Sequence, residues 1–268
     1  MSVCVVGEAL VDLVHQSAEP GRAERYPAER HPAERYPADH YVAHPGGSPF
    51  NVAIGLARLG QPVRLVARLA QDGFGRQLRS HALANGVDLS LAVAAAEPST
   101  LAVVSLDADR NAHYDFYRTG TADWQWTAGE LARIPADVGW LHAGSLASWI
   151  DPGALAIEAR LAELGPATVL SYDPNIRPAL LGDHAAALAQ IERLVGLSRV
   201  VKASAEDLAW LYPGRAVADA LRHWQALGPA VVVATDGGRG AWAVGDDGEP
   251  VRLPGRPVTV LDTVGAGD

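Results

Sequence analysis

Asp262-Thr263-Val264-Gly265-Ala266-Gly267-Asp268 is the most informative stretch of the sequence. Gly265 and Gly267 tolerate positive φ values, so successive backbone N–H groups there can point toward one anion. A helix that began in this stretch would add the positive end of its dipole to the same point. The carboxylate of Asp268, at the edge of this nest, can take a proton from an attacking hydroxyl. The stretch therefore predicts a site that phosphorylates an alcohol, although a Gly-x-Gly pattern alone is also typical of an ordinary turn.

Four further motifs precede this stretch: GEALVDL at 7–13, HPGGSPFNVA at 44–53, DGFG at 72–75 and DPNIR at 173–177. Together the five motifs resemble the signatures of the ribokinase-type (PfkB) carbohydrate kinases, and the fructokinase branch is the most similar. The resemblance implies a ribokinase-like fold and transfer of the γ-phosphoryl group of ATP to a primary hydroxyl of a sugar, with fructose expected. Because one fold serves many sugars, ribose and 2-keto-3-deoxygluconate are alternative substrates. A catalytically inactive sugar- or nucleotide-binding protein is the alternative from another class.

The composition predicts a folded, acidic protein. The 268 residues are 49% hydrophobic and 20% charged, which provides enough apolar material for a sizeable core. The net charge of −9 argues against nucleic acid or an anionic membrane surface as a partner. The single cysteine, Cys4, cannot form an internal disulfide, and there is no signal peptide and no apolar stretch of about 20 residues. We therefore expect a soluble cytoplasmic protein in which Cys4 is a small core residue.

Short apolar runs alternate with amphipathic segments along most of the chain. The runs expected to be buried strands are 3–6, 63–69, 140–142, 168–172, 200–202 and 231–235. Between them, 51–59 and 72–85 carry apolar residues on one helical face and are each followed by glycine. This alternation predicts a single α/β domain over residues 1–268, with a mostly parallel, doubly wound sheet flanked by helices. Ligands of such sheets bind at the carboxyl ends of the strands.

Two segments interrupt the alternation. Residues 100–118 alternate around a turn at 107–111, which predicts a β-hairpin with one exposed face. Residues 23–42 repeat Ala-Glu-Arg-Tyr-Pro with a five-residue period, and a proline every fifth residue excludes a regular helix. We interpret this repeat as a duplication within a surface loop. The resemblance implies that segments at about 13–45 and 98–120 form a small β lid over the sugar, and it allows a homodimer through this lid.

The resemblance assigns sugar binding to Asp12, Gly46, Gly47, Asn51 and Arg177. Asp12 is expected just after the first strand, where a carboxylate can accept two sugar hydroxyls, but a loop-facing aspartate or a helix cap fits equally well. Gly46 and Gly47 let the backbone approach a ligand closely, yet a plain turn before a helix explains the same pair. Asn51 can donate and accept hydrogen bonds at once. The guanidinium of Arg177 suits a phosphate or sugar oxygen, and a surface ion pair is its alternative.

Polar residues after the strand at 200–202 are assigned to the nucleotide. The resemblance implies that Lys202 and Ser204 contact ATP and that an acidic residue organises Mg²⁺ through water. Asp207 is at the expected position and Glu206 is its neighbour, so the choice between the two carboxylates stays open. A helix N-cap at Ser204, with two acidic residues in the first turn, explains the same residues without a metal.

The segment after the strand at 231–235 contains Thr235, Gly237 and Gly240. The resemblance implies that this Gly-rich turn holds ATP. A hairpin turn between two strands is the alternative interpretation, and it is compatible with nucleotide binding.

The resemblance assigns the catalytic roles to the final stretch. Asp268 is implied to be the base, and the amides of Gly265, Ala266 and Gly267 to hold the phosphoryl charge. Mg²⁺ is expected to bridge the phosphates of ATP. Asp262 is implied to help bind the monovalent cation, K⁺, that some family members use.

Members of this family continue beyond the final Asp with helices that flank the adenine. Because the present sequence ends at Asp268, its α-carboxylate would add negative charge at the anion site. We therefore expect a chain without the C-terminal helices of the family, poorly stable and with little kinase activity. It would be either a fragment of a longer protein or a truncated copy.

Overall fold

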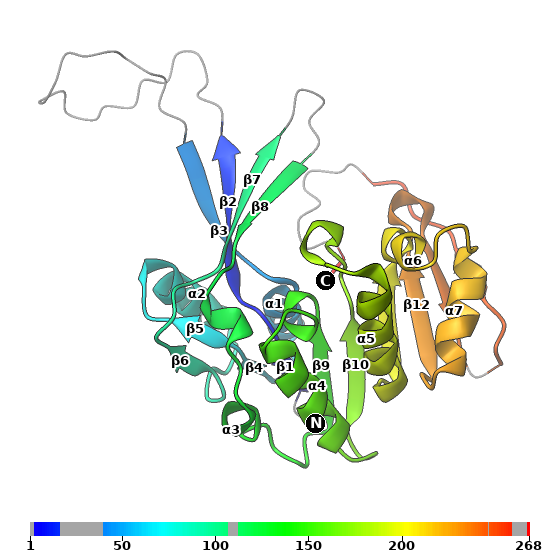
Figure 1. The fold of residues 1–268 in the computed structure, drawn as a ribbon, viewed down its shortest axis with the longest axis horizontal. Helices are drawn as coiled ribbons and strands as arrows, with labels where there is room; N and C mark the ends of the chain where they lie inside the picture. The colour runs from blue at the N-terminus through cyan, green and yellow to red at the C-terminus, as the bar shows by residue number, and fades with distance from the viewer. Residues whose placement is uncertain (1–2, 17–39, 107–111, 246, 259–266) are drawn as a thin grey trace, which may run out of the picture.

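A computed structural model describes residues 3–16, 40–106, 112–245, 247–258 and 267–268. Its largest element is an eight-stranded sheet with the order β14-β13-β12-β11-β10-β9-β1-β4 (Figure 1). Neighbours are parallel from β4 to β12, and β13 and β14 add an antiparallel edge. The predicted mostly parallel sheet is therefore confirmed. Its strands are β1 (Val3–Val6), β4 (Val63–Val66), β9 (Trp140–Gly144), β10 (Val169–Asp173), β11 (Val200–Ser204), β12 (Val231–Thr235), β13 (Ala241–Val244) and β14 (Val251–Leu253).

Helices pack on both faces of this sheet and form two apolar cores. Within β1, Cys4 and Val6 belong to one core and Val5 to the other, because successive side chains of a strand point to opposite faces. Cys4 is buried, as expected. None of the described helices is both long and apolar enough to cross a membrane. The Val5 core includes residues of α1 (Ser48–Arg58) and α2 (Gly73–Ala84), and the other core those of α4 (Gly153–Glu163), α5 (His184–Leu197), α6 (Ala205–Leu211) and α7 (Val217–Ala226).

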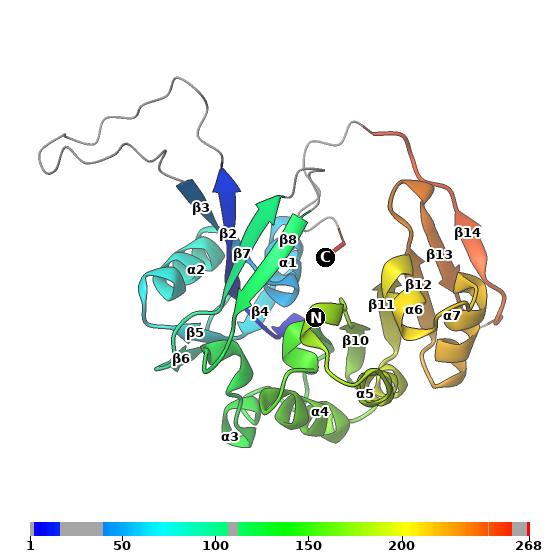
Figure 2. The same cartoon turned by 45° about the horizontal axis from the view of Figure 1, so that its top comes forward.

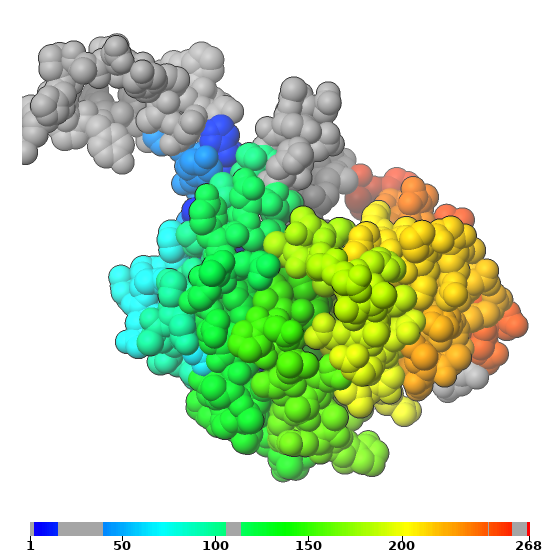
Figure 3. Space-filling model, in the orientation of Figure 1, coloured from blue at the N-terminus to red at the C-terminus, as the bar shows by residue number. Residues whose placement is uncertain are grey.

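A second sheet of four strands, in the order β3-β2-β7-β8, projects from the body (Figures 1 to 3). β2 is antiparallel to β3 and parallel to β7, and β7 and β8 form the predicted hairpin. The turn at 107–111 and residues 17–39, which include most of the repeat, lie outside the described residues. The strands are β2 (Leu10–Gln16), β3 (His40–Gly46), β7 (Leu101–Leu106) and β8 (Ala112–Tyr117).

The prediction of one strand at 63–69 is wrong. β4 ends at Val66, and β5 (Arg68–Ala70) leaves the large sheet to pair with β6 (Val93–Ala95) in a separate two-stranded sheet. The buried guanidinium of Arg68 holds β5 there. It donates to the Ala122 carbonyl at 3.0 Å, and it pairs with Glu97 at 2.8 Å and with Glu130 of the short helix α3 (Ala128–Leu131).

Polar contacts fix the small sheet to the body. Asp72 caps α2 by accepting from the Gly75 amide at 2.7 Å, and its other oxygen accepts from the Ser99 amide at 2.8 Å, just before β7. Asp123, in the 3₁₀ turn η1 (Ala122–Trp124), accepts from the Ala9 amide at 2.9 Å, just before β2. The DGFG motif therefore has a structural role, because it ties α2 to the segment that leads into the small sheet.

Candidate active site

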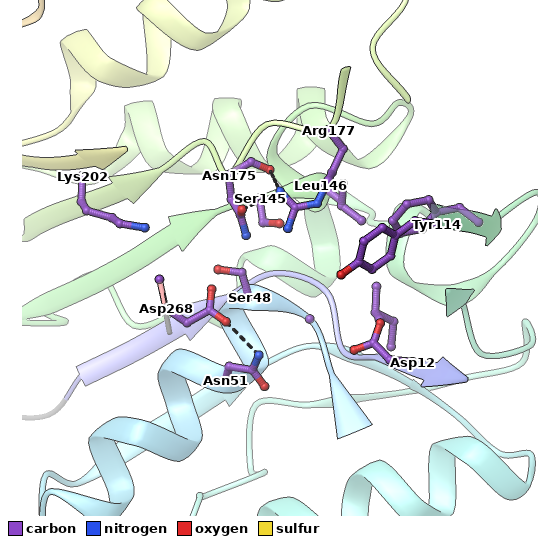
Figure 4. A pocket seen from close by; sticks show the side chains of 14 residues that line it. Asp12, Ser48, Asn51, Tyr114, Ser145, Leu146, Asn175, Arg177, Lys202 and Asp268 are labelled. Carbon is purple, nitrogen blue, oxygen red and sulfur yellow. Dashed lines mark hydrogen bonds between the residues drawn. The ribbon is translucent and has the colours of Figure 1, made fainter. Parts of the chain in front are cut away.

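A pocket opens between the small sheet, the start of α1 and the carboxyl ends of the parallel strands (Figure 4). This is the edge at which open α/β sheets bind their ligands. The small sheet and α1 line it with Leu10, Asp12, Tyr114, Phe116, Gly47, Ser48 and Asn51. The strand ends and the end of the chain line it with Ser145, Leu146, Asn175, Arg177, Lys202, Gly267 and Asp268.

Asp268 lies beside the first turn of α1. Its Oδ2 accepts a hydrogen bond from Nδ2 of Asn51 at 2.8 Å, and its second oxygen faces the pocket (Figure 4). The backbone N–H of Asn51 bonds to the Gly47 carbonyl at 2.9 Å, so its position follows from the helix itself. The positive end of the helix dipole also favours a carboxylate here. The base expected from the sequence is thus held in a fixed direction.

Asp12 faces the same pocket from the small sheet. It lies within β2 rather than directly after the first strand, and it pairs in register with His44 of β3. Burial raises the pKa of its carboxyl to about 6, and the nearby Asp268 adds to this, whereas His44 and Arg177 oppose it. The two carboxyl groups and the Arg177 guanidinium therefore share one electrostatic environment.

The two adjacent glycines serve different purposes. Gly46 is the last residue of β3, and a Cβ there would overlap the carboxylate of Asp12. Gly47 is the N-cap of α1, with φ of 100°, and a Cβ there would lie 2.8 Å from the carbonyl oxygen of Glu8. Because Gly47 already begins the helix, α1 starts at Ser48 rather than at residue 51 as predicted. Only Gly47 of the two lines the pocket.

Arg177 enters the pocket from the loop after β10. Its Nη1 donates to the side-chain oxygen of Asn175 at 2.8 Å and to the carbonyl of Ile176 at 3.0 Å (Figure 4). Asn175 has φ of 41°, which bends the loop so that both side chains face the pocket. Arg177 forms no ion pair with any carboxylate of the described residues. Within that part of the chain, the alternative of a surface ion pair is therefore wrong.

Lys202 approaches the pocket from β11. Its Nζ lies 2.8 Å from Oδ2 of Asp173, the last residue of β10. Burial raises the pKa of the Asp173 carboxyl to about 6, although the neighbouring Lys202 lowers it. A Cβ on Gly267 would lie 3.4 Å from the same Nζ, so this cation borders the final stretch of the chain.

Ser204 and Asp207 form a capping box at the start of α6. The Asp207 amide donates to the Ser204 hydroxyl at 3.0 Å, and Oδ2 of Asp207 accepts from the Ser204 amide at 2.9 Å. The other Asp207 oxygen accepts from the Ile176 amide at 2.9 Å. The N-cap interpretation is therefore correct. Both Asp207 oxygens are occupied by backbone donors, whereas Glu206 is exposed.

The residues predicted to hold ATP after β12 lie outside this pocket. Gly237, with φ of 51°, and Gly240, with φ of 102°, make the turn of the antiparallel hairpin between β12 and β13. Thr235 ends β12 and is paired in register with Ser204, so both lie at the carboxyl edge of the sheet, as Lys202 does. The hairpin interpretation is confirmed, and a hairpin at this edge is compatible with contact to a nucleotide.

Three predicted site residues cannot be placed. Asp262, Gly265 and Ala266 lie outside the described residues, whereas Gly267 and Asp268 are described and line the pocket. Among the residues that the structure describes, no group of three or more His, Cys, Asp or Glu side chains could hold a metal ion.

Sequence reasoning missed several pocket residues. Ser145 follows β9 with φ of 55° and ψ of −154°, a conformation that costs a non-glycine residue about 1–3 kcal/mol. Leu146 begins the adjoining 3₁₀ turn η2 (Leu146–Ser148), and Tyr114 points into the pocket from β8 (Figure 4). A weak signal for Ser145 was present, because it lies three residues after the strand predicted at 140–142, near the edge where ligands bind.

Comparison with known protein families gives one match over the whole chain. A family model described as "pfkB family carbohydrate kinase" matches residues 1–268. The chain is 36% identical over 263 residues to a fructokinase of Rhizobium leguminosarum bv. trifolii, covering 98% of this chain and 75% of the relative. It is 32% identical over 227 residues to a fructokinase of Klebsiella pneumoniae, covering 84% and 73%.

Solved structures with the same fold include two fructokinases. The fructokinase of Xylella fastidiosa with bound ATP superposes with a TM-score of 0.83 at 26% identity, covering 99% of this chain and 77% of that one. The fructokinase of Vibrio cholerae O395, in a form with fructose, ADP and calcium, gives a TM-score of 0.80 at 27% identity, covering 99% and 80%.

Proposed function

This chain belongs to the pfkB family of carbohydrate kinases, and on that premise we propose that it transfers the γ-phosphoryl group of ATP to a primary hydroxyl of fructose. The observation that carries the proposal is that Asp12 and Asp268 face one pocket from opposite sides (Figure 4). Two cationic side chains, Arg177 and Lys202, enter the same pocket from the strand ends. Fructokinases among the relatives, and a solved relative with bound fructose and ADP, favour fructose over the other sugars.

We assign roles by the direction of each side chain. Asp268 takes the proton of the attacking hydroxyl, and Asn51 keeps its carboxylate pointed at that hydroxyl. Asp12 accepts hydrogen bonds from other hydroxyls of the sugar and so fixes its orientation. Arg177 and Lys202 offset the negative charge of the phosphoryl group as it is transferred.

The small sheet fits the role of a lid over the sugar. Its face toward the pocket carries Asp12, Tyr114 and Phe116, and the two aromatic rings stack with centroids 6.1 Å apart. A polar group beside a stacked aromatic surface suits a sugar, which has both hydroxyls and apolar C–H faces. Closure of this sheet would exclude water from the transferring phosphoryl group.

A divalent cation fits as a companion of ATP rather than as an ion caged by the protein. Mg²⁺ at kinase sites binds substrate phosphates plus one or two carboxylates, and the described residues offer no larger donor group. Exposed Glu206 is the freer of the two acidic candidates, since both oxygens of Asp207 accept backbone N–H groups. When bound, Mg²⁺ neutralises charge on the phosphates. Potassium and calcium are present in solved forms of the Vibrio cholerae fructokinase.

Sugar-dependent release of ADP tests the proposed function. The purified chain, and a version extended with a C-terminal segment like that of the family, are each incubated with ATP, Mg²⁺ and fructose, ribose or 2-keto-3-deoxygluconate. Initial rates are compared with a sugar-free control. We expect fructose to give the highest kcat/KM. A much higher value for either other sugar would correct the substrate, and binding of sugar without any sugar-dependent ADP release would indicate an inactive binding protein.

The pH dependence of fructose use should follow Asp12. The pKa of its carboxyl is raised to about 6, so the charged form that accepts hydroxyls best is present above that pH and lost as pH falls through it. We expect kcat/KM for fructose to decline below about pH 6 and to be level above about pH 7.

The Asp12→Asn variant is the control for this prediction. Asn accepts a hydroxyl without charge, so kcat/KM for fructose at pH 8 should fall about 10–100-fold, as expected for one hydrogen bond to a charged group. The decline attributed to Asp12 should disappear, and KM for ATP should stay within about threefold. An unchanged pH profile in Asp12→Asn would assign the decline to another group.

A further inference from the structure

Glu8 is a buried carboxyl group for which the proposed mechanism has no use. It lies in the short connection between β1 and β2, where the chain passes from the large sheet to the small one, and it is 0% exposed. Burial raises the pKa of its carboxyl to about 7, although the hydrogen bond that it accepts from the Ala147 amide opposes this. Burying an ionisable group is costly unless its interactions compensate, so its contacts indicate what it does.

The first contact is with the turn after β9. Oε2 of Glu8 accepts a hydrogen bond from the Ala147 amide at 3.1 Å. This turn also contains Ser145 and Leu146, which line the pocket, and Ser145 holds a backbone conformation with positive φ. A second anchor is the Ser145 amide, which donates to the Asp173 carbonyl at 2.8 Å. The hydroxyl of Ser148, in the same turn, also lies 3.3 Å from that of Tyr172. Glu8 therefore supplies one of the polar anchors of a strained segment of the pocket wall.

The second contact is with the start of α1. A Cβ on Gly47 would lie 2.8 Å from the Glu8 carbonyl oxygen and 3.3 Å from the Glu8 Cγ. Gly47 is the N-cap of α1, the helix whose first turn carries Asn51 and so directs Asp268. One buried residue thus touches both the turn at 145–147 and the start of α1, and both segments line the pocket.

We propose that Glu8 is a positioning residue for the sugar: it fixes the distance between the turn at 145–147 and the start of α1, and it sets the affinity for fructose without touching the sugar. This proposal rests on the proposed function, because the effect of Glu8 is measured through the binding of fructose. The affinity for ATP should be nearly independent of Glu8.

Asp123 provides a matched control in the same junction. It is 1% exposed, burial raises the pKa of its carboxyl to about 6, and it also accepts one backbone N–H, that of Ala9. It does not line the pocket. Removal of either acid therefore deletes a buried carboxyl that anchors the junction, but only removal of Glu8 releases a pocket wall.

The test compares Glu8→Ala, Glu8→Gln, Asp123→Ala and the wild-type chain. Fructose and ATP affinities are measured by calorimetry, and amide hydrogen exchange is measured at 145–148. We expect Glu8→Ala to weaken fructose binding at least 10-fold and ATP binding less than threefold, with faster exchange at 145–148. Glu8→Gln retains an acceptor for the Ala147 amide and should stay within threefold of wild type. Asp123→Ala should lower Tm but leave fructose affinity and this exchange unchanged.

Several outcomes would overturn the proposal. Unchanged fructose affinity in Glu8→Ala, or an equal loss in Asp123→Ala, would reduce Glu8 to a purely structural residue. If Glu8→Ala does not fold, Glu8→Asp, whose shorter side chain withdraws the acceptor from Ala147, must bind fructose at least fivefold more weakly than Glu8→Gln. If the wild type binds no fructose, the proposed function fails instead, and unchanged exchange at 145–148 in Glu8→Ala would still refute the anchoring role.

Discussion

Replacing Asp268 with Asn is expected to lower kcat by about 10²–10⁴-fold, the usual contribution of a positioned general base. Asn has nearly the same shape and its amide oxygen can still accept from Nδ2 of Asn51, so the pocket should keep its form. The affinity for fructose should therefore change by less than about threefold. Steady-state release of ADP gives kcat, and calorimetry with fructose gives the affinity.

Asn51→Ala is the companion variant for this prediction. It removes the donor that directs the Asp268 carboxylate but leaves the base itself, so its loss in kcat should be smaller than that of Asp268→Asn. The double variant should be no slower than Asp268→Asn alone, because the two residues act as one unit. A kcat for Asp268→Asn within a few-fold of wild type would refute its assignment as the base.

Much of the large sheet could be predicted because its strands are short apolar runs between helices. The runs at 3–6 and 231–235 match β1 and β12 to the residue, and the carboxyl ends of the strands do carry the pocket. The prediction of a single strand at 63–69 failed because the hydrophobicity of a segment does not show where its pairing partner changes from one sheet to another. The strand is broken next to Arg68, whose partners Glu97 and Glu130 are distant in sequence.

The residues of the site could be predicted where a motif marks them or, for Lys202, where a predicted strand ends. Asp12, Gly47, Asn51, Arg177 and Asp268 belong to motifs, and the structure places all of them at one pocket. Ser145, Leu146 and Tyr114 belong to none of the motifs. They reach the pocket through the turn after β9 and the pairing of β7 with β8, which depend on tertiary contacts. The N-cap at Ser204 could be predicted because it is local, but the bond from the Ile176 amide to the other Asp207 oxygen is long-range, and only the structure shows it.

Lys202 has two roles that a single substitution would confound. Its Nζ compensates the buried carboxylate of Asp173 at 2.8 Å, and it also lines the pocket beside Gly267. Lys202→Met should therefore reduce stability as well as ATP binding. A cycle of Lys202→Met, Asp173→Asn and the double variant separates the two roles.

We expect Lys202→Met to destabilise the fold by at least about 2 kcal/mol at pH 8. Breaking a fully buried pair costs about 3–5 kcal/mol, and this pair should cost less because the Lys202 side chain is 26% exposed. The pKa of the Asp173 carboxyl, already raised to about 6, rises further without its cation. Protonation then relieves the buried charge, so the loss should shrink as pH falls toward 5 and grow as pH rises to 8.

The double variant decides what Lys202 does for the nucleotide. Asp173→Asn removes the carboxylate that needs a cation, so adding it to Lys202→Met should restore most of the lost stability, measured by denaturant unfolding at pH 8. ATP affinity should remain as weak as in Lys202→Met, because the pocket still lacks its cation. Recovery of both stability and ATP affinity would show that Lys202 serves only to neutralise Asp173. Failure of the double variant to recover stability would contradict the pairing of Lys202 with Asp173 as the source of the loss.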